Sequence, residues 1–160
     1  MSQDKDKHAT REGEFQREAA VACFNKAWDL PDEKSRSQEE DMQMLVPTHA
    51  SRFHWGNAGK RDNWAMRDWQ ISRIYADLKQ PTLASLFAQS ALDTCEENNL
   101  GEILLSAYEG MARACAVAED SEKARQYVDK ARQQLGSVKE EEDRKIYAQQ
   151  IDEAEALISK

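Results

Sequence analysis

The sequence predicts an all-α fold, a stack of antiparallel helical hairpins that contains about seven helices. Three observations lead to this prediction. The 160 residues include only three prolines and six glycines, which fall mostly between periodic segments. No stretch shows the sustained alternation of β-branched and polar residues that is typical of strands. Apolar residues instead recur three and four positions apart, which is the spacing of one face of an α-helix.

The first helix is expected over residues 11–30, and Pro31 is expected to end it because proline lacks a backbone donor. The polar residues 1–10 are expected to form a disordered lead-in to this helix. They contain no apolar core, so they do not have the pattern of a secretory signal.

The second helix is expected over residues 38–58. Ser37 and Glu40 have the spacing of a capping box, in which the hydroxyl accepts from a backbone N–H and the carboxylate reaches back. Gly59 suits a left-handed turn at the end of this helix. Pro47 lies inside the span and is expected to kink or split the helix.

Five further helices are expected to begin at or just after Asp62, Pro81, Gly101, Asp120 and Ser137. Proline is a favourable first helical residue, and Ser137 with Glu140 has the spacing of a second capping box. One domain is therefore expected. It consists of an irregular first hairpin, two regular hairpins and a polar capping helix, over residues 11–60, 61–136 and 137–160.

A repeat of 40 residues underlies the two regular hairpins. Shifted by 40 positions, residues 72–76 (SRIYA) align with residues 112–116 (ARACA). The same shift pairs residues of the helix that follows: Ala84 with Ala124, Phe87 with Tyr127, and Ala91 with Ala131. Small residues thus recur where two helices must approach closely, and large apolar ones recur between them, as a stacked hairpin requires.

These positions resemble the tetratricopeptide-repeat (TPR) family, in which a small residue of the first helix packs against an alanine of the second. The matching residues are Ser72, Tyr75, Ala84, Ala88 and Ala91 in one hairpin and Ala112, Cys115, Ala124, Val128 and Ala131 in the next. Lys79 and Glu119 stand where the family has a turn glycine, and the offset of 40 residues exceeds its usual ~34. The resemblance implies a TPR-like stack that binds a protein or peptide and is not an enzyme.

The resemblance also implies a concave groove that is lined by the first helix of each hairpin. The residues carried over to it are Trp69, Arg73, Asp77, Glu109 and Arg113. Two arginines on adjacent helices could hold an acidic group or carboxylate of the partner through bidentate hydrogen bonds, with the tryptophan as an apolar anchor. The alternative is that both arginines form salt bridges between helices, for instance with Glu109 or Asp77, and only brace the stack.

Residues 49–80 concentrate three of the four tryptophans, two histidines and a net charge of +3, in a chain whose net charge is −8. Arg52, His54 and Trp55 of this segment are therefore also expected to contribute to partner binding. The main rival hypothesis is a small-molecule-binding or enzymatic pocket around Arg52, His54, Trp55 and Trp64. A third hypothesis is a homodimer, because short arrays often cover an exposed end by self-association.

Residues 48–55 (THASRFHW) and 69–76 (WQISRIYA) are also similar to a group of small bacterial proteins of unassigned activity. This similarity implies a bacterial protein of the cytoplasm and no particular activity. The groove is thus the one site that a family resemblance suggests.

Composition argues against several other classes. The acidic net charge disfavours nucleic-acid binding, and no apolar run approaches the ~20 residues that span a bilayer. His49 and His54 would point ~140° away from each other on a helix, so no metal site is expected. No catalytic motif or nucleotide-binding glycine loop is present, and no cofactor is expected. The three cysteines lie far apart, which favours free thiols in a reducing cytoplasm.

Overall fold

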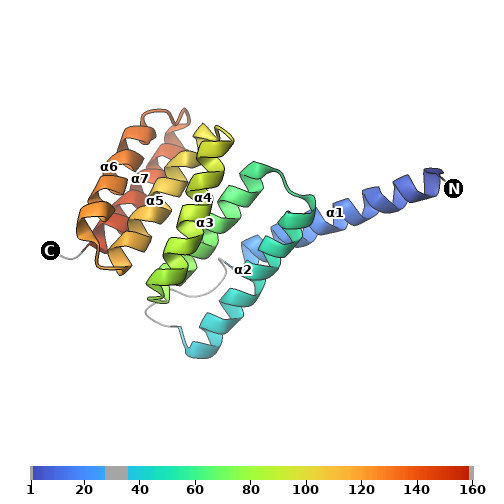
Figure 1. Cartoon of the computed structure of the whole chain (residues 1–160), viewed down its shortest axis with the longest axis horizontal. Helices are drawn as coiled ribbons and strands as arrows, with labels where there is room; N and C mark the ends of the chain where they lie inside the picture. Colours follow the sequence, from blue (N-terminus) through green and yellow to red (C-terminus); the bar gives the residue numbers. More distant parts are fainter. Residues whose placement is uncertain (1, 28–35, 159–160) are drawn as a thin grey trace.

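A computed structural model describes residues 2–27 and 36–158, which are helical apart from short turns (Figure 1). Seven helices lie in these two ranges and confirm the predicted all-α class. They are α1 (Ser2–Lys26), α2 (Gln38–Ala58), α3 (Arg61–Asp77), α4 (Pro81–Glu97), α5 (Gly101–Val117), α6 (Ser121–Leu135) and α7 (Glu141–Ala156). Pro31, which was expected to end the first helix, lies outside the described residues.

The helices pack mostly as neighbouring pairs along the sequence, which makes a stack of hairpins. α1 packs on α2, α3 on α4, and α5 on α6, while α5 also contacts both α3 and α7. The helices α3, α5 and α7 therefore form one layer of the stack, and α4 and α6 form the other. Figure 1 shows α1 leaving the stack as a long projecting helix, with the two termini at opposite ends of the molecule.

Side-chain signals account for the starts of three helices. The Ser37 hydroxyl accepts from the backbone N–H of Glu40, and the Glu40 carboxylate accepts from the N–H of Ser37, so the predicted capping box begins α2. Pro81 is the first residue of α4. The Asp120 side chain caps α6 by accepting from the N–H of Lys123 at 3.2 Å.

The expectation of a left-handed Gly59 is wrong, and so is the alternative in which Pro47 splits α2. Pro47 does not split it, because this proline is buried in a continuous helix, where the neighbouring Thr48 hydroxyl donates to the carbonyl of Met44 (2.7 Å). Gly59 is extended rather than left-handed, with φ −86°. A Cβ at this position would lie 2.7 Å from the Trp55 carbonyl oxygen, so the glycine is required for space.

The ends of the chain also differ from expectation. α1 begins at Ser2, so residues 2–10 are helical where a disordered lead-in was expected. No proline or glycine interrupts them, so nothing in the backbone prevents the helix from extending. α7 begins at Glu141, without the second capping box, because the Ser137 hydroxyl donates instead to the carbonyl of Gln134 (2.7 Å).

The three turns between α3 and α4, α4 and α5, and α5 and α6 share one backbone conformation, which the sequence did not predict. Lys79, Asn99 and Glu119 have φ between 53° and 62°, in the left-handed region that favours glycine. After each of them, the next backbone N–H bonds the carbonyl five residues earlier, at 2.9–3.0 Å. This closure satisfies the last carbonyls of the preceding helix and offsets a strain of about 1–2 kcal/mol per residue.

Small residues allow the layers of the stack to approach closely. The core between α3, α4 and α5 contains seven buried alanines: Ala65, Ala76, Ala84, Ala88, Ala91, Ala107 and Ala114. Gly110 of α5 faces α3, and a Cβ there would lie 3.0 Å from Ser72 Oγ and 3.1 Å from Trp69 Cδ1. The contact between α3 and α5 therefore depends on this glycine, and it brings the predicted groove residues of the two helices together.

All three cysteines are free thiols. Burial, together with the nearby Glu96 carboxylate, raises the pKa of the Cys95 thiol to about 11, so this thiol is unreactive at neutral pH. No helix in the described ranges combines the length and apolar character that crossing a bilayer requires.

Candidate functional site

A groove with a volume of about 560 Å³ runs along the layer formed by α3, α5 and α7; it is called the central groove below. Phe24 of α1 stands at its edge. Its walls include Met66, Trp69 and Arg73 from α3, Ser106 from α5, and Ile146, Gln150 and Glu153 from α7. Of the five residues carried over from the TPR resemblance, Trp69 and Arg73 line this groove, whereas Glu109 and Arg113 are buried and Asp77 is not among its walls.

The 40-residue repeat places equivalent positions of the three helices around this groove. Trp69, Glu109 and Gln149 are equivalent, and so are Arg73, Arg113 and Glu153. The residues predicted from the sequence include the α3 and α5 members of these sets but not Gln149 and Glu153 on α7. The signal was present, because a second shift by 40 residues from Arg113 reaches Glu153.

Glu109 is the centre of a buried ion network beneath the groove. Its side chain is completely buried and accepts from Trp69 Nε1 (2.7 Å) and from Arg113 Nε. Arg73 lies 3.8 Å from the same carboxylate, and its guanidinium carbon is 5.3 Å from the centre of the Trp69 ring. One carboxylate therefore holds three side chains from two helices.

Glu153 extends this network to α7. One of its carboxylate oxygens lies 3.0 Å from Arg113 and 3.7 Å from Arg73, and the other accepts from Gln149 (3.0 Å). The bracing salt bridges that were the alternative to ligand binding are therefore present. A carboxylate of a partner would have to displace Glu153 to reach both arginines, so its binding here stays a prediction.

Burial and charge act on the two arginines with different results. Burial lowers the pKa of Arg73, although the Glu109 carboxylate acts against this effect. Burial is also the largest single effect on Arg113, but the charge and hydrogen bond of Glu109 together with the charges of Asp77 and Glu153 outweigh it, so the pKa of Arg113 is raised. Asp77 favours the charged form of both arginines, so all five residues carried over to the groove interact. Both arginines are protonated at neutral pH.

A smaller depression of about 190 Å³, here called the side pocket, adjoins the central groove and shares Phe24 and Met66 with it. Its other walls are Val21 of α1, Trp55 of α2, and Asn63 and Arg67 of α3. Apolar side chains predominate. The groove therefore continues from a charged region over α5 and α7 to an apolar region between α1, α2 and α3.

The four residues of the rival pocket have different neighbours. Arg52 Nε bonds a carboxylate of α3 at 3.0 Å, and His54 Nδ1 bonds an amide oxygen of α1 at 2.6 Å. The indole N–H of Trp64 donates to the carbonyl of Trp55 at 3.0 Å. Of the four, Trp55 lines the side pocket, and none lines the central groove. Arg52, His54, Trp55 and Trp64 therefore do not line one common pocket among these two depressions.

Asp68 links the irregular first hairpin to the regular ones. It is buried in α3, and its Oδ1 lies 3.0 Å from Arg52 Nε of α2 and 3.2 Å from Arg67 Nε. Its Oδ2 accepts from the Ser90 hydroxyl of α4 at 2.6 Å. Arg52, one of the predicted partner-binding residues, is therefore itself part of a structural ion pair between α2 and α3.

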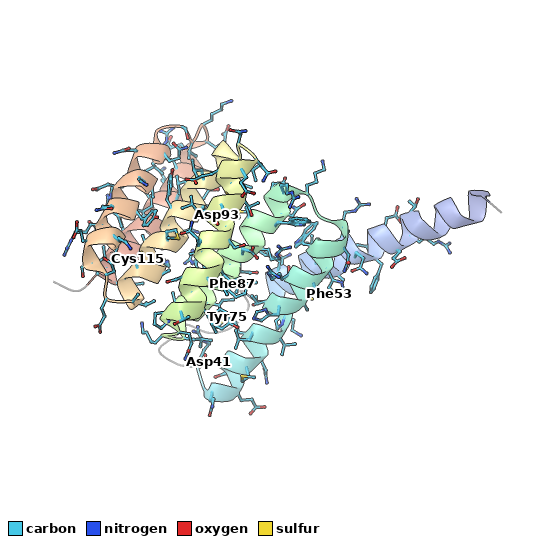
Figure 2. All side chains as sticks on the ribbon, in the orientation of Figure 1. Asp41, Phe53, Tyr75, Phe87, Asp93 and Cys115 are labelled. Carbon is cyan, nitrogen blue, oxygen red and sulfur yellow. The ribbon has the colours of Figure 1, made fainter. Side chains whose placement is uncertain are left out.

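His49 takes part in an aromatic cluster where α2, α3 and α4 meet. Its Nε2 lies 2.8 Å from the Tyr75 hydroxyl, and Tyr75 stacks on Phe87 with 5.8 Å between ring centres (Figure 2). Burial and the positive charge of Arg52 lower the pKa of His49 below its usual 6.5. In the described ranges, no three His, Cys, Asp or Glu side chains are grouped so as to hold a metal ion.

Acidification is expected to destabilise the protein through His49. Its pKa is lower in the folded than in the unfolded chain, so its contribution is complete above pH 6.5 and falls as the pH drops from there towards the folded pKa. Thermal melting of the wild type and a His49→Gln variant at pH 7.5 and 5.5 measures this. The wild type should lose more stability than the variant between the two values. Equal losses would assign the pH dependence to other groups.

The groove is the feature of the described structure that best suits ligand binding. The ion network accounts for the buried charges, and the walls of the groove combine apolar, amide and carboxylate groups. Compared with protein-family models, with curated proteins and with solved structures, the chain shows no match.

Proposed function

We propose that this chain is a non-enzymatic, TPR-like interaction module of the cytoplasm that binds a segment of a partner protein in the central groove. The observation that carries the proposal is that equivalent positions of two successive hairpins and of the capping helix α7, namely Met66, Ser106 and Ile146, all line the groove. A repeated wall suits a chain-like ligand, because each repeat offers similar contacts along its length. The free thiols are consistent with a reducing compartment.

The groove has the features of a preformed binding surface. The network around Glu109 holds α3, α5 and α7 together, so little order has to be gained on binding. Ile146 lies on the groove wall with 54% of its surface exposed, and Val21 is 45% exposed in the side pocket. A partner that covers such apolar side chains gains affinity from their burial.

A random peptide library displayed on phage, selected on the purified full chain, tests this function. The enriched peptides are synthesised with a fluorescent label, and their affinities are measured by anisotropy. The variant Val21→Gln/Ile146→Gln removes two exposed apolar groups from the groove walls. Val46→Gln/Leu86→Gln is the matched control, because these residues are 67% and 60% exposed on α2 and α4 and line neither depression.

The enriched peptides should bind the groove variant at least about tenfold more weakly than the wild type, a loss of ~1.4 kcal/mol. The control variant should bind them like the wild type. Failure to enrich any peptide, or equal binding to both variants, would remove the groove as the site of partner binding.

A further inference from the structure

Resting on the proposed function, we infer that the segment bound in the central groove is cationic and amphipathic. Its lysine or arginine side chains face the α7 wall, and an apolar side chain enters the side pocket. Three independent features of the groove lead to this assignment: its balance of charge, its unpartnered hydrogen-bond acceptors and the place of its apolar surface.

The charges in and beneath the groove leave an excess of carboxylates. Arg73 and Arg113 face Glu109 and Glu153 in the ion network, and Asp77 acts on both arginines. Asp143 adds a fourth carboxylate on the α7 wall; it is exposed and forms no ion pair with any described residue. Four carboxylates against two guanidinium groups attract a cation and repel an anion.

Two residues of the groove walls carry a buried side-chain oxygen that has no hydrogen-bond partner among the described residues. Of the three buried side-chain polar atoms that lack a hydrogen bond within the described ranges, two belong to groove-lining residues, namely Ser106 Oγ and Gln150 Oε1. Ser106 is 1% exposed. An amide oxygen only accepts, and a hydroxyl can accept, so both suit N–H donors. Both oxygens are shielded from solvent, so the N–H groups of a partner satisfy them only where the Ser106 or Gln150 side chain turns toward the groove.

The apolar side chains of the side pocket come from α1, α2 and α3, whereas Asp143 comes from α7. Val21, Phe24, Trp55 and Met66 surround the side pocket, and Phe24 and Met66 connect it to the central groove. One segment can therefore place an apolar side chain between α1, α2 and α3 and a basic side chain beside α7. Lysine and arginine suit the junction, because their alkyl stems pack on apolar walls while their charged ends reach the carboxylates.

The selected peptides provide the test. Sequencing should show Lys and Arg enriched and Asp and Glu depleted relative to the unselected library. For one enriched peptide, versions with every basic residue changed to Gln or to Glu are compared with the original. Affinity should fall about tenfold or more for the Glu version, with the Gln version between them.

Charge reversal in the protein locates the effect. Asp143→Lys should weaken the basic peptide by about tenfold and strengthen its Glu version. Asp129→Lys is the control; it changes the net charge equally, from an exposed position on α6 outside the groove. The cationic assignment would be overturned, with peptide binding left intact, by enrichment of acidic peptides, the ligands that the pair of arginines suggested. Equal effects of Asp143→Lys and Asp129→Lys would overturn it in the same way. A library that enriches no peptide would remove both inferences.

Discussion

Replacing Glu109 with alanine is expected to lower the free energy of unfolding by about 3–5 kcal/mol. The carboxylate is fully buried, and its loss would leave Arg113 and the Trp69 indole N–H without their shared acceptor. Arg113 would keep Glu153, whose side chain is 44% exposed, as a counter-charge. A buried cation that loses its buried counter-charge is strongly destabilised, because water cannot replace that interaction. The melting temperature of a chain of this size should fall by roughly 6–20 °C.

Thermal unfolding followed by circular dichroism measures this effect, with Glu141→Ala as the control. Glu141 is exposed and pairs with Lys145 at 2.8 Å in the same helix, so the same substitution should cost less than about 1 kcal/mol there. The double variant Glu109→Ala/Arg113→Ala should be less destabilised than the sum of its single variants, because both single substitutions break the same Glu109–Arg113 pair. Similar melting temperatures for Glu109→Ala and Glu141→Ala would show that the network does not brace the stack.

The start of a helix is predicted best from the sequence where a side chain caps its first turn. The capping box at Ser37 and the cap at Asp120 are local devices, so their residue spacing was sufficient evidence. Ser137 and Glu140 have the same spacing, but the Ser137 hydroxyl donates to the carbonyl of Gln134 instead. Residue spacing alone does not show which of two nearby groups a hydroxyl will bond. The left-handed turns at Lys79 and Glu119 are set by the packing of hairpins, which overrides the local preference for glycine.

Those residues of the candidate site that lie at equivalent positions of the 40-residue repeat could be predicted from the sequence. Trp69 and Glu109 are 40 residues apart and form a hydrogen bond, and Arg73 and Arg113 occupy the same repeat position. Phe24 could not be placed in this way, because α1 lies outside the repeat. Its position depends on contacts distant in sequence, such as the bond from Gln70 Nε2 to the Phe24 carbonyl at 2.9 Å.

Replacing Asp68 with alanine is expected to destabilise the protein by about 3–5 kcal/mol, and to do so mainly at the first hairpin. Asp68 is buried and holds Arg52 of α2, Arg67 of α3 and Ser90 of α4 on one carboxylate. Arg67 is also buried and would lose its partner, whereas the side chain of Arg52 is 44% exposed and can be solvated. The penalty therefore comes mostly from Arg67.

Chemical denaturation gives the size of this loss, and hydrogen exchange gives its location. Asp93→Ala is the control, because Asp93 is exposed on α4 and accepts one surface hydrogen bond from Gln89 (2.7 Å), so its loss should cost within about 0.5 kcal/mol (Figure 2). In Asp68→Ala, amides of α2 should lose more protection than those of α6, because the lost contacts tie α2 to the regular stack. Equal loss along the whole chain would mean that the first hairpin unfolds together with the repeats. The irregular hairpin would then be part of one cooperative unit, and the side pocket between α1, α2 and α3 would be as rigid as the central groove.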